Sequence, residues 1–256
     1  MYSARPIPLA GIEGYTRPLL HGTFGHNFMA KRVYLFNEGS KDDQDLLGGK
    51  GANLCEMTSL GLPVPFGFII TTSTCREYFQ AGNKLPSLLE QEYRVALDLV
   101  EKKMGARFGD PENPLLFSVR SGAPVSMPGM MNTILNLGLN DEITEGLASK
   151  TGNPRFAYDS YRRFIQMFAD VVLDVDGHKF EHELERYKRA NNKAQDTDMS
   201  ADDWREIVRI YKSLANLPED PFVQLKLAVE AVFRSWHTPR AVVYREMNNI
   251  DDSLGT

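Results

Sequence analysis

The chain has 256 residues, of which 42% are hydrophobic and 25% are charged, and its formal net charge is −5. This composition is typical of a globular protein with a core of its own, and the acidic balance argues against a dedicated nucleic-acid binder. No stretch approaches the roughly 18 consecutive apolar residues of a membrane-spanning helix. Two cysteines, Cys55 and Cys75, cannot form a disulfide framework, so a reducing compartment is expected.

The first 28 residues differ from the rest, because they show no helical or strand period and contain one acidic residue, Glu13. Two interpretations stay open. A transit peptide would be basic and poor in acids, as this segment is, but also rich in serine, and only Ser3 is present. We favour a disordered extension, since Met29 opens what reads like a new start. The expected compartment is the cytoplasm, or an organelle such as a plastid if residues 1–28 form a transit peptide.

A strand, a glycine-rich loop and a helix are expected after this extension. Residues 31–36, KRVYLF, are typical of a strand, and Gly48 and Gly49 follow in a loop. The apolar positions of LCEMTSL then repeat at helical spacing, and Gly61 and Pro63 end the helix.

Two more strands and a helix are expected before residue 120. Residues 68–72, FIITT, and 115–119 are typical of strands, and the second of them ends at Arg120. Between these strands, apolar residues recur every three or four positions over 89–104, which predicts an amphipathic helix.

After about residue 140 the helical period dominates. Apolar stripes predict three helices there, within 161–172, 204–214 and 222–236. Ser200 and Asp203 resemble a capping box at the start of the second helix, and the polar segment 188–200 is expected to be an exposed loop. The expected fold is mixed α and β, with strands dominating early and helices late.

The segment LLGGKGANL, residues 46–54, is the first candidate for chemistry. Two glycines let a backbone approach a ligand closely, the N–H groups of the following helix favour an anion, and Lys50 adds a positive charge. The segment lacks the Gly-Lys-Ser/Thr ending of a Walker A motif. On this loop alone, a tight turn with a solvated lysine is the better-supported interpretation.

The segment VRSGAPVSMPGMM, residues 119–131, is the second candidate. Arg120 at the carboxyl end of a strand lies where α/β sheets usually present ligand-binding residues, and a guanidinium contacts phosphate oxygens in pairs. Small residues leave room for a ligand, and three methionines suit an irregular apolar surface. In the alternative interpretation, the methionines fill the core and Arg120 pairs with a surface acid.

His178 and His182, in HKFEH, lie four residues apart on an expected helix, a spacing that can bind a metal. No third ligand is evident, and the neighbouring positions are typical of a charged, solvated helix, so no metal site is expected. His21, His26 and His237 form no catalytic arrangement with a serine or cysteine.

Several long motifs resemble the N-terminal nucleotide-binding domain of the pyruvate, phosphate dikinase family, over about residues 31–256. They are LLGGKGANLCEM, LGLPVPFGFIITT, FSVRSGAPVSMPGMMNTILNLGLND, KTGNPRFAYDSYRRFIQMF and AVFRSWHTPRAVVYREMNNI. The Arg-Ser-Gly-Ala and Gly-Gly-Lys-Gly elements alone would also fit phosphoenolpyruvate synthase or the glucan dikinases. SMPGMM and GNPRFAYDSYRRFI favour the pyruvate enzyme.

This resemblance implies an α+β fold, the first lobe of an ATP-grasp fold with an inserted helical subdomain. The implied ranges are 29–139 for the α/β part of the lobe, 140–220 for the helical subdomain and 221–256 for a return to the lobe. A second lobe is expected to follow.

The resemblance also implies a site. Lys50 and Arg120 match two basic catalytic residues around the ATP phosphates, where they offset charge as the bond to the β-phosphorus breaks. The implied nucleotide-binding residues are Gly49, Lys50, Gly51, Arg120, Ser121, Gly122 and Met131. The family converts ATP, phosphate and pyruvate into AMP, pyrophosphate and phosphoenolpyruvate through a phosphohistidine, using Mg²⁺ whose ligands are expected in the second lobe.

The chain departs from the family pattern in two positions and in length. Phe66 stands where the family usually has proline or another small or polar residue, and Asn132 where it usually has aspartate, which removes a carboxylate near the site. The second lobe, the swivelling histidine domain and the pyruvate-binding barrel are expected outside this sequence. The chain by itself is therefore expected to be inactive, and the full-length protein to be a homo-oligomer.

Two alternatives to the ATP-binding part of such a dikinase stay open. The chain could be a non-catalytic nucleotide-binding module or remnant, or part of a dikinase-type enzyme with another acceptor. At the carboxyl end, residues after Asn249 are expected to lack partners, so the segment from about Asp251 is expected to be mobile.

Overall fold

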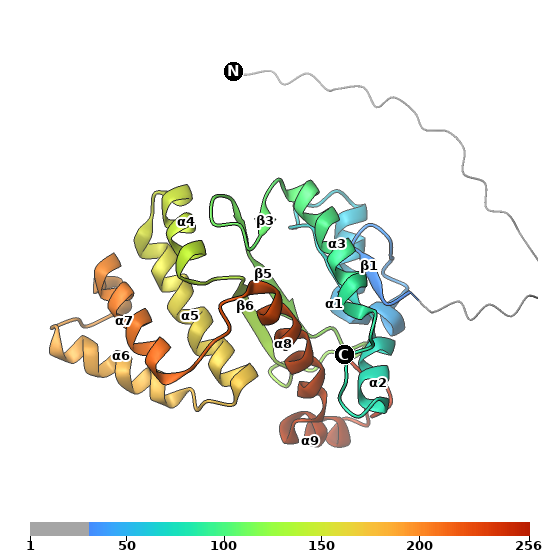
Figure 1. The fold of residues 1–256 in the computed structure, drawn as a ribbon. Helices are drawn as coiled ribbons and strands as arrows, with labels where there is room; N and C mark the ends of the chain where they lie inside the picture. Colours follow the sequence, from blue (N-terminus) through green and yellow to red (C-terminus); the bar gives the residue numbers. More distant parts are fainter. Residues whose placement is uncertain (1–30) are drawn as a thin grey trace, which may run out of the picture. The chain divides into compact units, whose positions relative to one another are not determined.

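Short strands form three two-stranded sheets in the computed structural model, which describes residues 31–256 (Figure 1). The pairs are β1 (Val33–Leu35) with β2 (Phe68–Ile70), antiparallel; β3 (Arg107–Phe108) with β4 (Pro114–Leu115), parallel; and β5 (Phe117–Arg120) with β6 (Thr133–Leu137), antiparallel. The strands predicted within 31–36 and 68–72 are confirmed, whereas the strand predicted at 115–119 is divided between β4 and β5.

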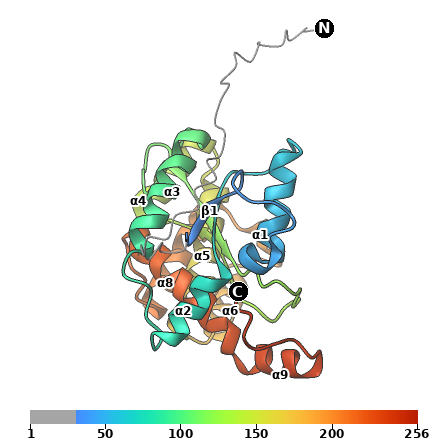
Figure 2. The same ribbon diagram turned by 90° about the vertical axis from the view of Figure 1, so that its right-hand side faces the viewer.

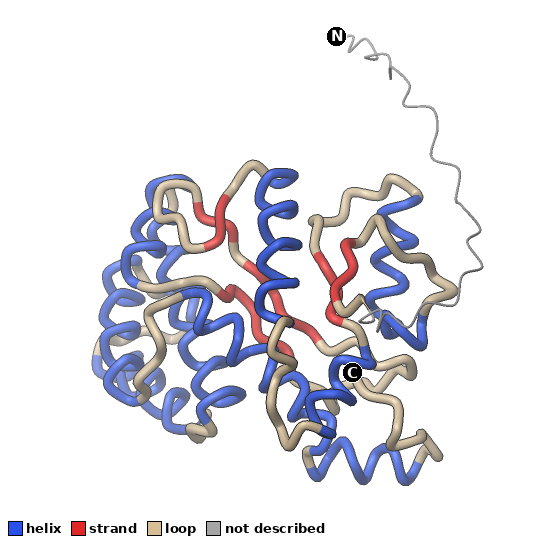
Figure 3. The backbone as a smooth tube through the Cα atoms, turned by 45° about the vertical axis from the view of Figure 1, so that its right-hand side comes forward, coloured by secondary structure: helices blue, strands red, loops and turns tan. Residues whose placement is uncertain are grey.

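Helices predominate along the whole described chain, as the blue segments of Figure 3 show. They are α1 (Gln44–Ser59), α2 (Thr72–Gln80), α3 (Leu89–Met104), α4 (Asp141–Thr151), α5 (Pro154–Leu173), α6 (His178–Ala190), α7 (Ala201–Leu214), α8 (Pro221–Arg234) and α9 (Pro239–Met247). The expected early dominance of strands is therefore wrong, because α1, α2 and α3 lie among the first strands. None of the helices described here is long and apolar enough to cross a membrane.

Side-chain caps explain why several of these helices begin where they do. The capping box predicted at the start of α7 is confirmed, since Ser200 Oγ accepts the N–H of Asp203 and the Asp203 carboxylate accepts the N–H of Ser200. Asn140 and Asn153 likewise accept backbone N–H groups at the starts of α4 and α5. Each cap satisfies an N–H that has no partner inside the helix.

One continuous apolar core connects the early and late parts of the described chain. Buried side chains from Val33 to Phe233 belong to a single hydrophobic cluster. Helix α5 is central to it and packs against α4, α7 and β6. In Figure 1, α4 to α7 gather on one side, α1 to α3 on the other, and β5, β6 and α8 lie between them. Residues 31–256 form one compact unit; the interpretation of residues 1–28 lies outside the described residues.

The carboxyl-terminal segment is packed, so the expectation that residues after Asn249 lack partners is wrong. Arg245 is 1% exposed, and its Nε donates to the Asp252 carboxylate at 2.6 Å. Trp236 Nε1 donates to the backbone carbonyl of Asp252 at 3.2 Å, and Thr256 is buried. A buried guanidinium is costly without an anionic partner, and Asp252 supplies it.

Candidate functional site

Two glycines bring the first and second candidate segments into backbone contact. Gly48 has φ 69° and ψ 162°, which interrupts α1 in its first half. A Cβ at this position would lie 1.2 Å from the carbonyl oxygen of Gly122, so only glycine fits. The N–H of Gly49 donates to the carbonyl of Ala123 at 3.0 Å. The turn before Lys50 is therefore held directly against the loop that follows Arg120.

The helix in this segment begins earlier than predicted. The sequence predicted a glycine loop with the helix after it, but α1 begins at Gln44 and Gly48 breaks it. Leu47, in the turn before the break, is 2% exposed, and this burial favours helix upstream of the glycines. Lys50 then lies in the first turn after the break. N–H groups in a first turn lack helical acceptors and favour an anion.

Lys50 and Arg120 form a pair of positive charges at this junction. Both side chains are exposed, and partial burial followed by repulsion from the Arg120 guanidinium lowers the pKa of Lys50. Within residues 31–256, no carboxylate lies within ion-pair distance of either group. Among the described residues, Arg120 therefore does not form the ion pair with a surface acid that the alternative interpretation expected. Two close cations without a counter-charge favour a polyanionic ligand.

The strand argument that pointed to Arg120 needs a correction. Arg120 is the last residue of β5, as predicted, but β5 pairs antiparallel with β6, and Arg120 lies opposite Thr133. The rule for parallel α/β sheets therefore does not apply here. Arg120 is presented instead at the end of a hairpin strand, where the chain leaves the sheet for the loop 121–132.

Most of the other predicted site residues lie at the same junction. Ser121 is 4% exposed, and a Cβ on Gly122 would lie 3.6 Å from the carbonyl oxygen of Leu47. Gly51 packs against the side chain of Ile69, which a Cβ would approach to 3.1 Å. Their contact with a nucleotide stays a prediction.

Met131 lies in a different environment. It packs with Met127 and Met130 in a second hydrophobic cluster around Trp236 and Ala241. This arrangement fits the alternative interpretation, in which the methionines fill the core. A role for Met131 beside a nucleotide stays a prediction.

Sequence reasoning missed three residues that shape the junction. Gly48 was part of the motif but not of the predicted binding set. Thr256 Oγ1 accepts the N–H of Gly122 at 3.1 Å. Arg240 Nε donates to the carbonyl of Met130 at 3.1 Å, and its Nη2 donates to Asn132 Oδ1. The Gly-Gly pair in the sequence could have indicated that Gly48 makes a close backbone contact. No pattern of apolar or polar residues indicates that Thr256 or Arg240 contacts the loop after Arg120.

The histidine pair on α6 is exposed and is occupied by local contacts. His178 Nδ1 lies 3.1 Å from a carboxylate oxygen of Glu181, and His182 Nδ1 lies 3.6 Å from Glu183. In the part of the chain that the structure describes, no group of three His, Cys, Asp or Glu side chains could hold a metal ion.

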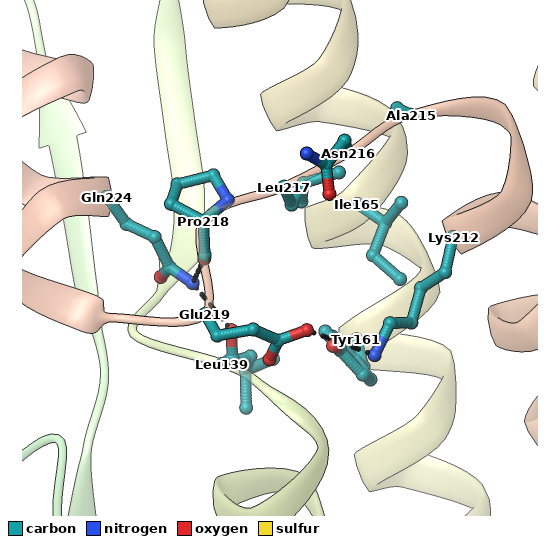
Figure 4. Close-up of a pocket in the computed structure, with 10 residues that line it drawn as sticks. All are labelled: Leu139, Tyr161, Ile165, Lys212, Ala215, Asn216, Leu217, Pro218, Glu219 and Gln224. Carbon is teal, nitrogen blue, oxygen red and sulfur yellow. Dashed lines mark hydrogen bonds and ion pairs between the residues drawn. The ribbon is translucent and has the colours of Figure 1, made fainter.

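A small cavity of about 40 Å³ lies in the helical part, beside α5 and the segment that leads to α8 (Figure 4). Lys212 at its edge forms ion pairs with Asp141 at 2.7 Å and Glu219 at 3.2 Å. Burial, followed by the Asp141 charge, raises the pKa of Tyr161, another of its lining residues. Its charges are paired and its volume suits a water molecule rather than a nucleotide, so it is not the candidate site.

Both cysteines are buried and free. Burial raises the pKa of Cys75 to about 11, which leaves its thiol protonated at neutral pH. Neither side chain is therefore a candidate nucleophile.

Comparison with known proteins gives consistent matches over most of the chain. The family model described as "Pyruvate phosphate dikinase, AMP/ATP-binding domain" matches residues 44–98 and 83–255. Pyruvate, phosphate dikinase of Clostridium symbiosum is 52% identical over 235 residues, covering 89% of this chain and 27% of the relative. The chloroplastic pyruvate, phosphate dikinase 1 of Oryza sativa is 53% identical over 236 residues, covering 88% of this chain and 25% of the relative. Pyruvate, phosphate dikinase of Giardia intestinalis is 50% identical over 239 residues, covering 88% of this chain and 27% of the relative. The chain thus spans about a quarter of the length of these relatives.

Proposed function

The chain belongs to the pyruvate phosphate dikinase AMP/ATP-binding domain family, and we propose that it binds ATP through phosphate contacts made by Lys50 and Arg120. The observation that carries this proposal is the pair of uncompensated cations at a glycine junction. A triphosphate supplies the missing negative charge, and a guanidinium and an ammonium are its usual protein partners.

The backbone contact between the Gly48 and Gly122 segments brings the Lys50 and Arg120 segments together. The contact between Gly48 and Gly122 places Lys50 beside the loop that follows Arg120, and the N–H of Gly49 is already donated to the Ala123 carbonyl, so the phosphate contacts we propose are those of the two side chains. Lys50 and Arg120 then offset negative charge on the polyphosphate. This stabilisation grows as charge develops on the leaving oxygens, which is how such residues accelerate phosphoryl transfer.

The finer assignment follows the family. We place residues 29–139 and 221–256 in the first lobe of an ATP-grasp fold and residues 140–220 in an inserted helical subdomain. In this proposal the chain is the ATP-binding part of a dikinase that converts ATP, phosphate and pyruvate into AMP, pyrophosphate and phosphoenolpyruvate. The steps that use pyruvate and a phosphohistidine belong to domains outside the sequence. Following the family, we place the Mg²⁺ ligands in the second lobe.

Calorimetric titration of Mg–ATP into the wild-type chain, Lys50→Met and Arg120→Ala tests the proposal. Each substitution should weaken binding by about 1–3 kcal/mol, the range for a charged hydrogen bond, which is about 5- to 150-fold in Kd. Pyrophosphate should compete with ATP, because the contacts are to phosphate.

Arg209→Ala is the matched control. Arg209 is an exposed arginine on α7 that pairs only with Glu206 on its own helix, so its removal subtracts the same charge away from the site. Equal affinities of wild type, Lys50→Met and Arg120→Ala for ATP would contradict the proposal. If Arg209→Ala lost as much affinity as Arg120→Ala, the loss would be an effect of net charge, and the phosphate contact of Arg120 would be wrong.

A further inference from the structure

The loop 121–132 carries one side of the candidate site but has few contacts within itself. It connects β5 to β6, and its first residues supply the carbonyls that meet Gly48 and Gly49. Its middle is exposed at Val125, Ser126, Pro128 and Gly129. One turn-like hydrogen bond, from Met130 N–H to the Met127 carbonyl, lies inside it. A loop of this length needs contacts with other segments to hold one conformation.

The segment from Trp236 onward supplies those contacts. Met127 is buried against Trp236 and Ala241 in the middle of the loop. Arg240, in the first turn of α9, binds the end of the loop through two donors, one to the Met130 carbonyl at 3.1 Å and one to Asn132 Oδ1. Figure 2 shows this loop, in light green, between α1 and α9.

The position of Asn132 connects this contact to the candidate site. Asn132 directly precedes Thr133, and Thr133 is the strand partner of Arg120. Holding the backbone carbonyl of Met130 and the side chain of Asn132 therefore constrains the direction in which the chain enters β6. That direction in turn determines where the end of β5 places the Arg120 side chain.

We propose that Arg240 is a positioning residue for the nucleotide site, which holds the loop 121–132 so that Arg120 and the Gly122 and Ala123 carbonyls stay in place against Gly48 and Gly49. This inference rests on the proposed function. Arginine suits the task because its planar guanidinium directs two donors at two acceptors in a fixed geometry. Lysine would offer a single flexible ammonium and would hold one acceptor well.

The affinity measurement compares Arg240→Ala, Arg240→Lys and Asn132→Ala with wild type, with Arg209→Ala as the control for charge. Arg240 is exposed, so its removal should leave the melting temperature close to that of wild type. The Kd for Mg–ATP should rise about three- to tenfold in Arg240→Ala, less in Arg240→Lys, and not in Arg209→Ala. Asn132→Ala should add little to Arg240→Ala in the double variant, because the two side chains share one contact.

Hydrogen exchange without nucleotide gives a readout that does not depend on ATP binding. Amides of residues 122–131 should exchange faster in Arg240→Ala than in wild type, while amides of α5 and α7 should not change.

The outcomes separate this inference from the function on which it rests. If wild type binds ATP and Arg120→Ala does not, while Arg240→Ala matches wild type in Kd and in exchange, the positioning role is wrong and the ATP site stands. Faster loop exchange with an unchanged Kd also overturns the positioning role, since the loop would then loosen without consequence for the ligand. Absence of ATP binding by wild type would contradict the proposed function and the positioning role together.

Discussion

Gly48 and Gly122 determine how near the Lys50 and Arg120 segments can come. The positive φ of Gly48 is one requirement, and the carbonyl of Gly122 in the space of its absent side chain is a second and stronger one. Gly49 is less constrained, because a Cβ there would lie 3.5 Å from two carbonyl oxygens, an ordinary contact. The glycine requirement in GGKG therefore rests chiefly on its first residue.

Gly48→Ala should separate the two segments and destabilise the protein. The positive φ combined with ψ 162° is a conformation essentially restricted to glycine and costs another residue about 1–3 kcal/mol, and the clash with a backbone carbonyl cannot be relieved by a side-chain rotation. We expect a total loss of at least about 3 kcal/mol in urea unfolding, together with loss of ATP affinity.

Gly61→Ala is the control for this substitution. Gly61 has φ 71°, but nothing lies within 4 Å of the Cβ that alanine would add, so only the backbone cost of about 1 kcal/mol applies. Equal losses for Gly48→Ala and Gly61→Ala would show that the contact with Gly122 is not rigid.

Among the elements, α7 has the most elaborate helix start. Asp203 accepts hydrogen bonds from the N–H and the hydroxyl of Ser200, from Tyr187 OH at 3.0 Å and from Lys193 Nζ at 3.1 Å. Burial opposes the charge of this carboxylate, but the hydrogen bonds from Ser200, Lys193 and Tyr187 outweigh it and hold the pKa of Asp203 well below its usual range. The box thus ties α7 to the end of α6 as well as to its own first turn.

Asp203→Asn should destabilise the protein in a pH-dependent way. Because the pKa of Asp203 is lower in the folded than in the unfolded state, its charge contributes stability at pH values above the unfolded pKa of about 4. That contribution begins to decrease as the pH falls below about 4 and is lost completely only below the lower pKa of the folded state. We expect a deficit of about 1–2 kcal/mol at pH 7 that shrinks toward pH 3, measured by urea unfolding.

Asp202→Asn provides the comparison for a carboxylate in the same turn. The Asp202 side chain is 88% exposed and pairs only with Arg205, so its loss should have little effect at either pH. A deficit in Asp203→Asn that stays constant between pH 7 and pH 3 would mean that packing, not charge, is what the substitution removes.

For the described residues as a whole, the two hydrophobic clusters are joined rather than separate. Phe79 packs against both, with its ring 5.2 Å from that of Tyr78 in the large cluster and 4.3 Å from that of His237 beside Trp236. The large cluster itself runs through the first strands and the late helices. The helical part 140–220 thus shares its core with the segments that carry the candidate site.

This continuity predicts a single cooperative unfolding transition for residues 31–256. Removing the helices from the shared core would expose apolar surface on both sides, so partial unfolding is costly. Trp204 reports on the large cluster and Trp236 on the second. Calorimetry should give one peak, and tryptophan fluorescence and far-ultraviolet circular dichroism should share one urea midpoint. Two separated transitions would show that the helical part is an independent folding unit.

Those features that depend on neighbouring residues were predictable without a structure. The helix over 89–104 follows from apolar spacing within a few turns, and the Ser200–Asp203 box from residues three positions apart. Long motifs also identified the family, and the role of Lys50 and Arg120 at the ATP phosphates stays a prediction from that resemblance. The end of the strand predicted at 68–72 was not predictable, because a run such as FIITT has the same composition whether it continues as a strand or, as here, enters α2 at Thr72.

Contacts between distant segments needed the folded chain. No pattern in the sequence places the Gly122 carbonyl against Gly48, the Thr256 hydroxyl on the Gly122 N–H or Arg240 at the end of the loop 121–132. Such contacts arise because buried backbone groups must find hydrogen-bonding partners and buried charges must find counter-charges, wherever in the chain those partners are. Local sequence therefore specified the elements and the residue types of the site, and the packing of remote segments specified its geometry.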